Sequence, residues 1–238
     1  MRKILFIILF VFSIGNAGAQ ATSDSIVMNY LKEMGAPVTY NNEVKLLMTG
    51  HDKFVDLFEN IRHARHHIHL EYFNFRNDSI ANALFSLLAD NQPLKERHLK
   101  SIRAQGIEIV KFDPITFPWV NHAIHRDHRK IVVIDGKIGY TGGMNIADYY
   151  INGLPKIGKW HDMHIHLEGD AVRYLQGIFL TMWNRETGQH VGGPAYFPDT
   201  QQLPDSIAEE IAIVDRTPRE TPRSISHAYA ASIQAAQK

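Results

Sequence analysis

The feature that most constrains the fold is a run of residues that predicts a β-hairpin in the middle of the chain. Residues 131–134 form a continuous apolar stretch, which indicates a strand buried on both faces, and residues 137–141 indicate a second strand. Asp135 and Gly136 separate the two strands, and an Asp-Gly pair is the strongest short signal for a two-residue hairpin turn. The rest of the chain must therefore pack around a buried hairpin.

The predicted turn brings polar side chains together at the open end of this hairpin. It places His128 opposite Gly143 and Lys130 opposite Thr141, with Asn145 just beyond His128. His128 and Lys130 are two apart on an extended chain, so both point to one face. An imidazole beside an ammonium suits a phosphoryl centre, because charge on the non-bridging oxygens must be stabilised while a P–O bond breaks. Asn145 adds an amide donor, and Gly143 leaves room for an oxygen to approach backbone N–H groups.

The same residues carry a resemblance to a known family. His128-x-Lys130, an aspartate at Asp135 and a Gly-Gly-x-Asn sequence ending at Asn145 resemble the signature of the phospholipase D superfamily. Residues 128–148 are similar, more specifically, to bacterial cardiolipin synthases. The resemblance implies a phosphohistidine intermediate that His128 forms or assists, with Lys130 and Asn145 holding the phosphoryl oxygens. Asp135 matches the catalytic motif as well, but its place in the turn favours a structural role over a chemical one.

Two further segments extend the resemblance. Residues 160–164 resemble a Trp-x-Asp-x-His segment that follows the motif in cardiolipin synthases, and there the resemblance implies that Asp162 orients the catalytic histidine. From the residues alone, this role and a plain salt bridge at a strand end are equal alternatives for Asp162. The predicted strand that contains Glu71 also matches the family, so the similarity runs from about Val44 to the C-terminus.

The fourteen histidines raise the alternative of a metal site. Asp162, His164 and His166 alternate along one predicted strand, and His63 and His67 are one helical turn apart. The chain has no cysteine and no His-Glu-x-x-His sequence, so the metal signal is weak, and we expect neither a metal nor another cofactor. The histidines around His63 are better explained as caps of a helix C-terminus, where positive charge is favoured.

The N-terminus has the pattern of an export signal. Arg2 and Lys3 precede an apolar run over residues 4–14, and small residues at 17–19 follow. This predicts a signal peptide over residues 1–19, cleaved after Ala19, and an exported protein that is periplasmic or membrane-associated. A permanent anchor is the alternative, although a spanning helix needs about 20 apolar residues. Without cysteines, no disulfide stabilises the exported protein.

The charge balance bears on the substrate class. The chain has 25 basic and 25 acidic residues, and loss of Arg2 and Lys3 leaves 23 basic residues and a formal charge of −2. Nucleic-acid-binding proteins usually have a basic excess. The balance therefore favours a phospholipid at a membrane surface, with phosphatidylglycerol as the expected substrate, over a nucleic acid.

Hydrophobic periodicity predicts an α/β fold with a mixed sheet flanked by helices, the arrangement of a phospholipase D-like lobe. We expect a linker over residues 20–43, this lobe over 44–200 and the start of a second lobe over 201–238. Besides the hairpin, strands are expected at 44–48, 68–75, 107–112 and 163–167, and helices at 53–64, 79–89, 94–104 and 171–186.

Two features depart from the family pattern. The helices at 79–89 and 94–104 meet almost directly at Asp90 and Asn91, where the family places a core strand, so we infer an internal deletion that leaves an exposed sheet edge. A strand at 211–215 and a helix at 224–236 then repeat the strand and helix that open the lobe, which predicts a second lobe truncated at Lys238.

The number of motifs limits the reaction. The family reaction needs one histidine to attack phosphorus and another to protonate the leaving alcohol, and the chain has a single complete motif. A homodimer or a second-lobe fragment would supply the other histidine. Four alternatives follow: a phosphatidyltransferase that makes cardiolipin and glycerol from phosphatidylglycerol, a phospholipase D-type hydrolase, a dimeric nuclease, and an inactive truncated fragment.

Overall fold

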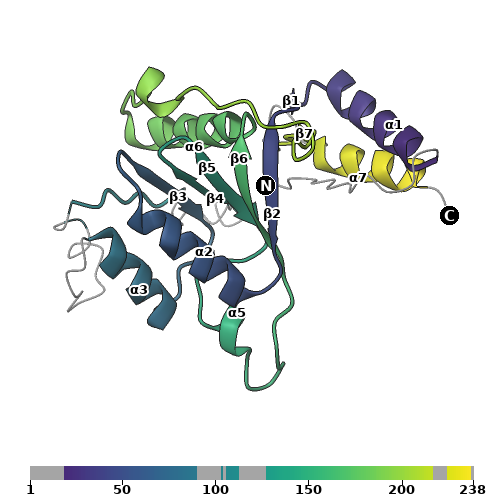
Figure 1. Cartoon of the computed structure of the whole chain (residues 1–238). Helices are drawn as coiled ribbons and strands as arrows, with labels where there is room; N and C mark the ends of the chain where they lie inside the picture. Colours follow the sequence, from purple (N-terminus) through teal and green to yellow (C-terminus); the bar gives the residue numbers. More distant parts are fainter. Residues whose placement is uncertain (1–18, 90–102, 104–105, 113–126, 217–223, 237–238) are drawn as a thin grey trace, which may run out of the picture.

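The computed structural model describes residues 19–89, 103, 106–112, 127–216 and 224–236. Within these residues, one antiparallel sheet lies between two layers of helices (Figure 1). A smaller unit, built from segments near both ends of the chain, lies beside the sheet. The expected α/β architecture, a sheet flanked by helices, is confirmed.

The main sheet has five strands in the order β2-β6-β5-β4-β3. Its members are β2 (Asn42–Leu47), β3 (Ile68–Tyr72), β4 (Lys130–Ile134), β5 (Ile138–Gly142) and β6 (His164–Gly169). These agree with the strands that the sequence predicts at 44–48, 68–75 and 163–167 and with the central hairpin. A mixed sheet was expected, but every described strand pair is antiparallel. The parallel pairing within the described ranges is an isolated bridge between Phe75 and Ile146.

The sheet is covered on both faces because β4 is apolar on both faces. Val132 and Ile134 face one core, formed with α2 (Gly50–Arg62), α3 (Ser79–Leu88) and α5 (Tyr149–Asn152). Ile131 and Val133 face a second core, formed with α6 (Val172–Thr187). All four side chains are at most 2% exposed, as a continuous apolar run predicts.

The first covering helix illustrates how the sequence sets these layers. Thr49 caps α2, because its hydroxyl accepts a hydrogen bond from the backbone N–H of Asp52 at 3.1 Å. Phe54, Leu57 and Ile61 then recur at helical spacing and are buried in the first core. The helix begins at Gly50, three residues before the predicted start at position 53. The prediction followed the apolar stripe, and the first turn of the helix lacks apolar residues that would reveal it.

The turn of the β4–β5 hairpin differs from the prediction by one residue. Ile131 lies opposite Thr141 and Ile134 opposite Ile138, whereas a two-residue loop would place Lys130 opposite Thr141. Asp135 and Gly136 both have positive φ, and the N–H of Lys137 donates to the carbonyl oxygen of Ile134 at 3.0 Å, as in a tight turn. Lys137 is therefore an additional loop residue, and the predicted pairing of His128 with Gly143 is wrong.

Asp135 fastens this turn to the segment that precedes β3. Its carboxylate accepts hydrogen bonds from the backbone N–H groups of Arg65, His66 and His67 at 2.7, 2.8 and 2.9 Å. These bonds lower the pKa of Asp135 and outweigh the opposite effect of burial. The turn position expected for Asp135 is thus the observed one, at the far end of β4 from Lys130.

The predicted strand at 107–112 is not formed. Residues 107 and 109 are partly buried and alternate with exposed neighbours, but none of the described strands pairs with this segment. An isolated extended segment cannot satisfy its backbone groups as a strand does, so alternation alone overpredicts strands. The predicted helix at 94–104, except position 103, and the proposed deletion at Asp90 and Asn91 lie outside the described residues. In the described part of the sheet, β3 is an edge strand.

The region expected to be a linker is structured. It contains α1 (Ala19–Glu33), β1 (Val38–Thr39) and the start of β2. β1 pairs with β7 (Ile211–Ala212), and α1 packs against α7 (Ser224–Ala235) (Figure 1). The prediction failed because the apolar face of α1 is buried against residues far away in the sequence, whose position sequence spacing does not give.

The segments predicted at 211–215 and 224–236 therefore pack against residues near the start of the chain. Val27 and Leu31 of α1 meet Ala212, Val214 and Ala228, and together they form a third, smaller core. The predicted signal peptide, apart from its last residue Ala19, lies outside the described residues. Among the residues searched, no helix has the length and apolar character that crossing a bilayer requires.

We predict that Asp135→Ala lowers the free energy of unfolding by about 2–3 kcal/mol at neutral pH, because three backbone N–H groups lose a charged acceptor and alanine is strained at positive φ. Asp135→Asn keeps one acceptor oxygen and tolerates positive φ, so its loss should be about 1 kcal/mol. Urea unfolding of both variants, with the exposed Asp205→Ala as control, measures these differences.

The pH dependence of the Asp135→Ala effect gives an independent check. A carboxylate whose pKa is lowered by folding stabilises the protein above its unfolded pKa of about 4 and loses that contribution as pH falls through the lower, folded value. The difference between wild type and Asp135→Ala should therefore shrink below about pH 4. An unchanged difference between pH 7 and pH 3 would contradict this assignment.

Candidate active site

The structure brings His128 and Lys130 together where β4 begins. Lys130 is only 2% exposed, whereas His128 is exposed two residues earlier. Lys130 Nζ lies 3.1 Å from His128 Nδ1 and donates to the carbonyl oxygen of His128 at 2.6 Å. Burial lowers the pKa of Lys130 to about 8, although the nearby Asp127 and Asp162 act in the opposite direction. The pair thus combines an accessible imidazole with an ammonium that titrates close to neutral pH.

Phe73 forms one wall beside this pair. Its ring centroid lies 4.7 Å from that of His128, and Lys130 Nζ lies 5.6 Å from the Phe73 ring. Phe73 directly follows β3, within the predicted strand that carries the family resemblance, and no local sequence signal pointed to a role for it. The ring limits the directions in which the imidazole can turn.

Gly143 and Asp162 meet at the end of β5. A Cβ atom on Gly143 would lie 1.9 Å from Asp162 Oδ1, so a larger residue does not fit there. The N–H of Gly143 donates to the carbonyl oxygen of Met163 at 2.9 Å. Space for a substrate oxygen was expected at Gly143, but in the structure the Asp162 carboxylate fills it. The shifted hairpin register explains the difference, because Gly143 lies one position from its expected place.

Asp162 lies near two lysines, Lys130 and Lys53. Burial raises its pKa, and the opposite effect of Lys130 and Lys53 is smaller. Its Oδ1 accepts a hydrogen bond from the N–H of Met163 at 2.8 Å. Asp162 therefore lies close enough to the lysines to balance their charge, and its orientation of His128 stays a prediction.

Asn145 lies in the loop that follows Gly143. The side chain is 7% exposed, and its Nδ2 donates to Tyr150 Oη at 3.3 Å. Its Oδ1 is buried and has no hydrogen-bond partner within the described residues. The amide is thus held from one side and has capacity to contact another group.

Lys53 is a component that the sequence analysis missed. It lies on α2, is fully buried, and its Nζ donates to the carbonyl oxygens of Met144 and Asn145 at 3.0 Å each. Burial holds the pKa of Lys53 well below its usual range, and Asp162 opposes this effect. The available signal was a lysine beside Phe54 on the apolar stripe of a predicted helix, a position where a charge must find partners.

His164 is a further buried polar residue, as are Lys53 and Asn145. It is fully buried, and neither ring nitrogen has a hydrogen-bond partner in the described part of the chain. Burial lowers the pKa of His164 well below its usual value, and Lys53 and Lys130 lower it further. The ring is therefore neutral at pH 7. Among the searched residues, no three histidine or carboxylate side chains are placed to hold one metal ion, so the structure adds no support to the alternative that joined Asp162, His164 and His166.

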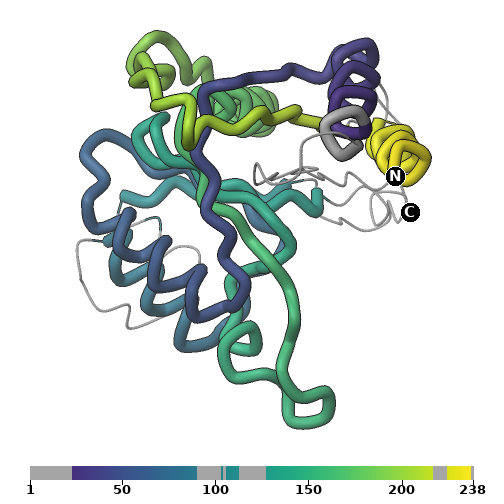
Figure 2. The backbone as a smooth tube through the Cα atoms, turned by 45° about the vertical axis from the view of Figure 1, so that its right-hand side comes forward, coloured from purple at the N-terminus to yellow at the C-terminus, as the bar shows by residue number. Residues whose placement is uncertain are grey.

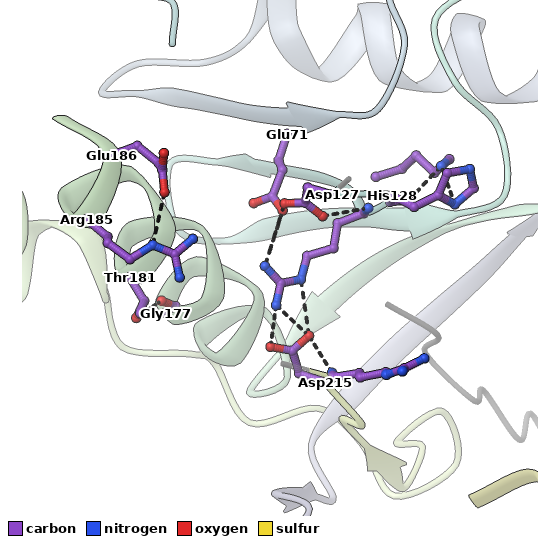
Figure 3. Close-up of polar contacts among 11 residues, drawn as sticks. Glu71, Asp127, His128, Gly177, Thr181, Arg185, Glu186 and Asp215 are labelled. Carbon is purple, nitrogen blue, oxygen red and sulfur yellow. Dashed lines mark hydrogen bonds and ion pairs between the residues drawn. The ribbon is translucent and has the colours of Figure 1, made fainter. Parts of the chain in front are cut away.

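A second charged group lies on the opposite side of β4. Arg129 makes a bidentate contact with Asp215, with Nη2 2.8 and 2.6 Å from the two carboxylate oxygens. Its Nη1 lies 3.6 Å from Glu71 and 3.7 Å from Asp127 (Figure 3). Burial raises the pKa of Glu71 well above its usual value, and the neighbouring Asp127 raises it further. Glu71 thus belongs to the support behind His128 rather than to the side that Lys130 faces.

Several cardiolipin synthases are similar to this chain. The protein of Halalkalibacterium halodurans is 37% identical over an alignment 177 positions long, which covers 67% of this chain and 35% of that protein. Those of a Geobacillus species (strain WCH70) and Bacillus cereus (cardiolipin synthase 1) are 33% and 34% identical and cover 85% and 86% of this chain, but 44% of their own length each. The chain thus spans less than half the length of these relatives.

Solved structures show weaker likeness. NucT from Helicobacter pylori has 12% identity and a TM-score of 0.38, with coverage of 60% of this chain and 97% of that one. Nuc from Salmonella typhimurium, a phospholipase D family member, has 12% identity and a TM-score of 0.37, with coverage of 60% and 95%. No protein-family model matches the chain.

The motif residues and the relatives agree. The chain carries His128 and Lys130 in contact at the start of β4 and Asn145 in the loop after β5, and its relatives at more than 30% identity are cardiolipin synthases. The chain belongs to the phospholipase D superfamily.

Proposed function

We propose that this chain supplies one half of a phosphatidyltransferase site, with phosphatidylglycerol as substrate and cardiolipin and glycerol as products. The observation that carries the proposal is the approach of Lys130 Nζ to within 3.1 Å of His128 Nδ1 at the start of β4, where Lys130 is buried and His128 is exposed. A nucleophilic nitrogen and a cation that share one position suit attack on an anionic phosphodiester. The similarity to cardiolipin synthases supports the choice of lipid.

The first chemical step needs a change in the resting contacts. His128 Nε2 attacks phosphorus, an N–P bond forms, and the P–O bond to the departing alcohol breaks. Attack through Nε2 requires the ring proton on Nδ1, which faces the Lys130 ammonium in this structure. A phosphoryl oxygen competes with His128 for Lys130, so substrate binding would draw the ammonium away and free Nδ1 for a proton.

Asn145 is suited to hold a second phosphoryl oxygen. Lys53 donates a hydrogen bond to its backbone carbonyl oxygen, and its side-chain amide donates to the Tyr150 hydroxyl, so both parts of the residue are held in place. A neutral amide donor stabilises charge that develops on an oxygen without adding a competing acid. Lys130 and Asn145 would then hold two oxygens while His128 approaches phosphorus.

The second half of the reaction needs another histidine. That residue gives a proton to the leaving glycerol alkoxide, then takes one from the hydroxyl of a second phosphatidylglycerol, whose oxygen attacks phosphorus and breaks the N–P bond. A second copy of the chain, related by a two-fold axis, would supply it, as would a further polypeptide. With water as acceptor, the same steps give phosphatidic acid and glycerol, the products of a hydrolase.

We predict that His128→Ala lowers phosphatidylglycerol turnover by about a thousandfold or more, because the nucleophile is lost. The assay incubates the purified chain with phosphatidylglycerol vesicles and separates cardiolipin from phosphatidic acid, while light scattering reports the oligomeric state. The exposed His63→Ala is the matched control and should retain activity.

The same preparation distinguishes the other functions. Phosphatidic acid without cardiolipin would indicate a hydrolase, and cleavage of DNA without lipid turnover would indicate a nuclease. A folded chain without any turnover, at concentrations where it dimerises, would overturn the proposal.

We predict that deprotonation of Lys130 lowers kcat/KM at alkaline pH. Its ammonium is present below its pKa of about 8 and is lost above it, so kcat/KM should fall above about pH 8 by about tenfold per unit. Lys130→Arg keeps its charge at all these pH values, so whatever activity it retains should lack this fall. The same fall in Lys130→Arg would assign the alkaline limit to another group.

We predict that Lys53→Met lowers kcat by about 10- to 100-fold, because a small displacement of the Asn145 loop misplaces a donor to the phosphoryl group. Methionine fills a similar volume and removes a buried amine, so the thermal midpoint should change by only a few degrees. Lys45→Met, at a lysine with a 65% exposed side chain, is the matched control. Unchanged kcat in Lys53→Met would exclude this positioning role.

A further inference from the structure

A short loop between α5 and β6 projects from the body of the molecule (Figure 2). We call residues 153–160 the tip. Leu154 and Gly158 form an antiparallel bridge, in which each N–H donates to the carbonyl oxygen of the other at 2.8 and 2.7 Å. Gly153 has φ +73, and a Cβ there would lie 2.4 Å from the carbonyl oxygen of Gly158. The tip is therefore a closed turn with a defined shape.

The tip exposes apolar and basic side chains together. Ile157 is 67% exposed, and Trp160 is 38% exposed. Lys156 and Lys159 flank Ile157 and are exposed. The sequence from 149 to 161 contains no acidic residue, and the next carboxylate, Asp162, is turned toward Gly143. Burying Ile157 in water-free surroundings is favourable, and the lysines add attraction to an anionic surface.

The tip is connected to the candidate active site through aromatic rings. The Trp160 ring meets that of Tyr149 at 5.1 Å between centroids, nearly edge-on, and that of Tyr150 at 6.3 Å. Tyr150 in turn accepts the hydrogen bond from Asn145. A surface that held the tip would therefore lie next to the residues that hold the phosphoryl group.

We propose that the tip docks on an anionic bilayer, with Ile157 inserted among the lipids, Trp160 at the interface and the two lysines on the headgroups. The inference rests on the proposed function, since a bilayer substrate gives a reason for such a surface beside the site. The combination of an exposed aliphatic residue, a tryptophan and lysines favours a bilayer over a second protein chain, whose interfaces are depleted in lysine. The occupant we assign is thus the membrane that contains the substrate.

The absence of cysteine from the sequence allows a local test on the full chain. Ile157→Cys provides a single site for an environment-sensitive fluorophore such as nitrobenzoxadiazole. Ile207→Cys, at an isoleucine with 44% exposure, is the control. The neighbouring Glu209 contacts Asn42 at the start of β2, whereas His164 of β6 pairs with Leu47 at the end of β2, so position 207 lies away from the candidate active site. The probe at 157 should shift to the blue and brighten several-fold on phosphatidylglycerol vesicles, and the probe at 207 should not.

Charge reversal tests the role of the lysines. Combined Lys156→Glu and Lys159→Glu should weaken the vesicle response of the probe at 157 by about tenfold or more, because two attractive charges become repulsive. Vesicles of phosphatidylcholine alone should give a weak response with the original lysines. A probe at 157 that stays in water on phosphatidylglycerol vesicles would overturn the proposal, as would a blue-shifted probe without vesicles, which indicates coverage by a second copy.

Failure of this inference and failure of the proposed function give different results. Turnover of a water-soluble phosphodiester, bis(p-nitrophenyl) phosphate, does not require a bilayer and should be unchanged by the Lys156→Glu and Lys159→Glu pair. Soluble turnover without a vesicle response at 157 would reject the tip alone. A vesicle response at 157 without any turnover would reject the proposed function and keep the docking surface.

Discussion

Burial of β4 on both faces is the constraint on which the rest of this structure depends. Its apolar residues alternate between two cores, and each core needs its own layer of helices. The polar residues that precede this apolar run must then leave the sheet on alternate sides. Lys130 turns toward the side of α2 and α5, and Arg129 turns toward the side of α6. A hydrophobic pattern in the strand thus determines to which side of the sheet Lys130 points.

The two sides of β4 balance their buried charges in different ways. Around Arg129 the structure places three carboxyl groups, and the bidentate contact with Asp215 fixes the guanidinium. On the Lys130 side, two lysines share Asp162, and burial lowers the pKa of both. On the Arg129 side the guanidinium is held in place by Asp215, which suits a supporting role. The Lys130 side keeps a positive character that an anionic group would relieve, which is what a phosphodiester site requires.

Local sequence signals predicted the parts of this arrangement that local physics controls. The apolar run of β4 and the Asp-Gly turn located the hairpin and brought His128 beside Lys130. The register failed by one residue because an additional loop residue, Lys137, changes the pairing without changing the turn signal. Lys53 escaped notice because its partners are backbone carbonyl oxygens about 90 residues away, and no sequence spacing encodes such a contact.

The same limit applies to the ends of the chain. Nothing within α1 indicates that its apolar face is buried by β7 and α7, because the partner lies at the opposite end of the sequence. A linker was therefore a reasonable prediction from local signals and was wrong. The predicted strand at 107–112 failed in the opposite way, since it has a strand pattern without a described partner. Both errors come from long-range pairing, which decides whether an amphipathic segment becomes part of the fold.

The position of Asp215 connects these two observations to the site. It belongs to the segment between β7 and α7, and its carboxylate holds Arg129, the residue between His128 and Lys130. The small unit formed by α1, β1, β7 and α7 is thus linked to the segment that carries His128 and Lys130 through the partly buried ion pair between Asp215 and Arg129. Loss of that unit would leave Arg129 with Glu71 and Asp127 as carboxyl neighbours, and burial raises the pKa of Glu71 well above its usual value. The alignment of His128 therefore depends on residues at both ends of the described chain, although the motif itself is short and local.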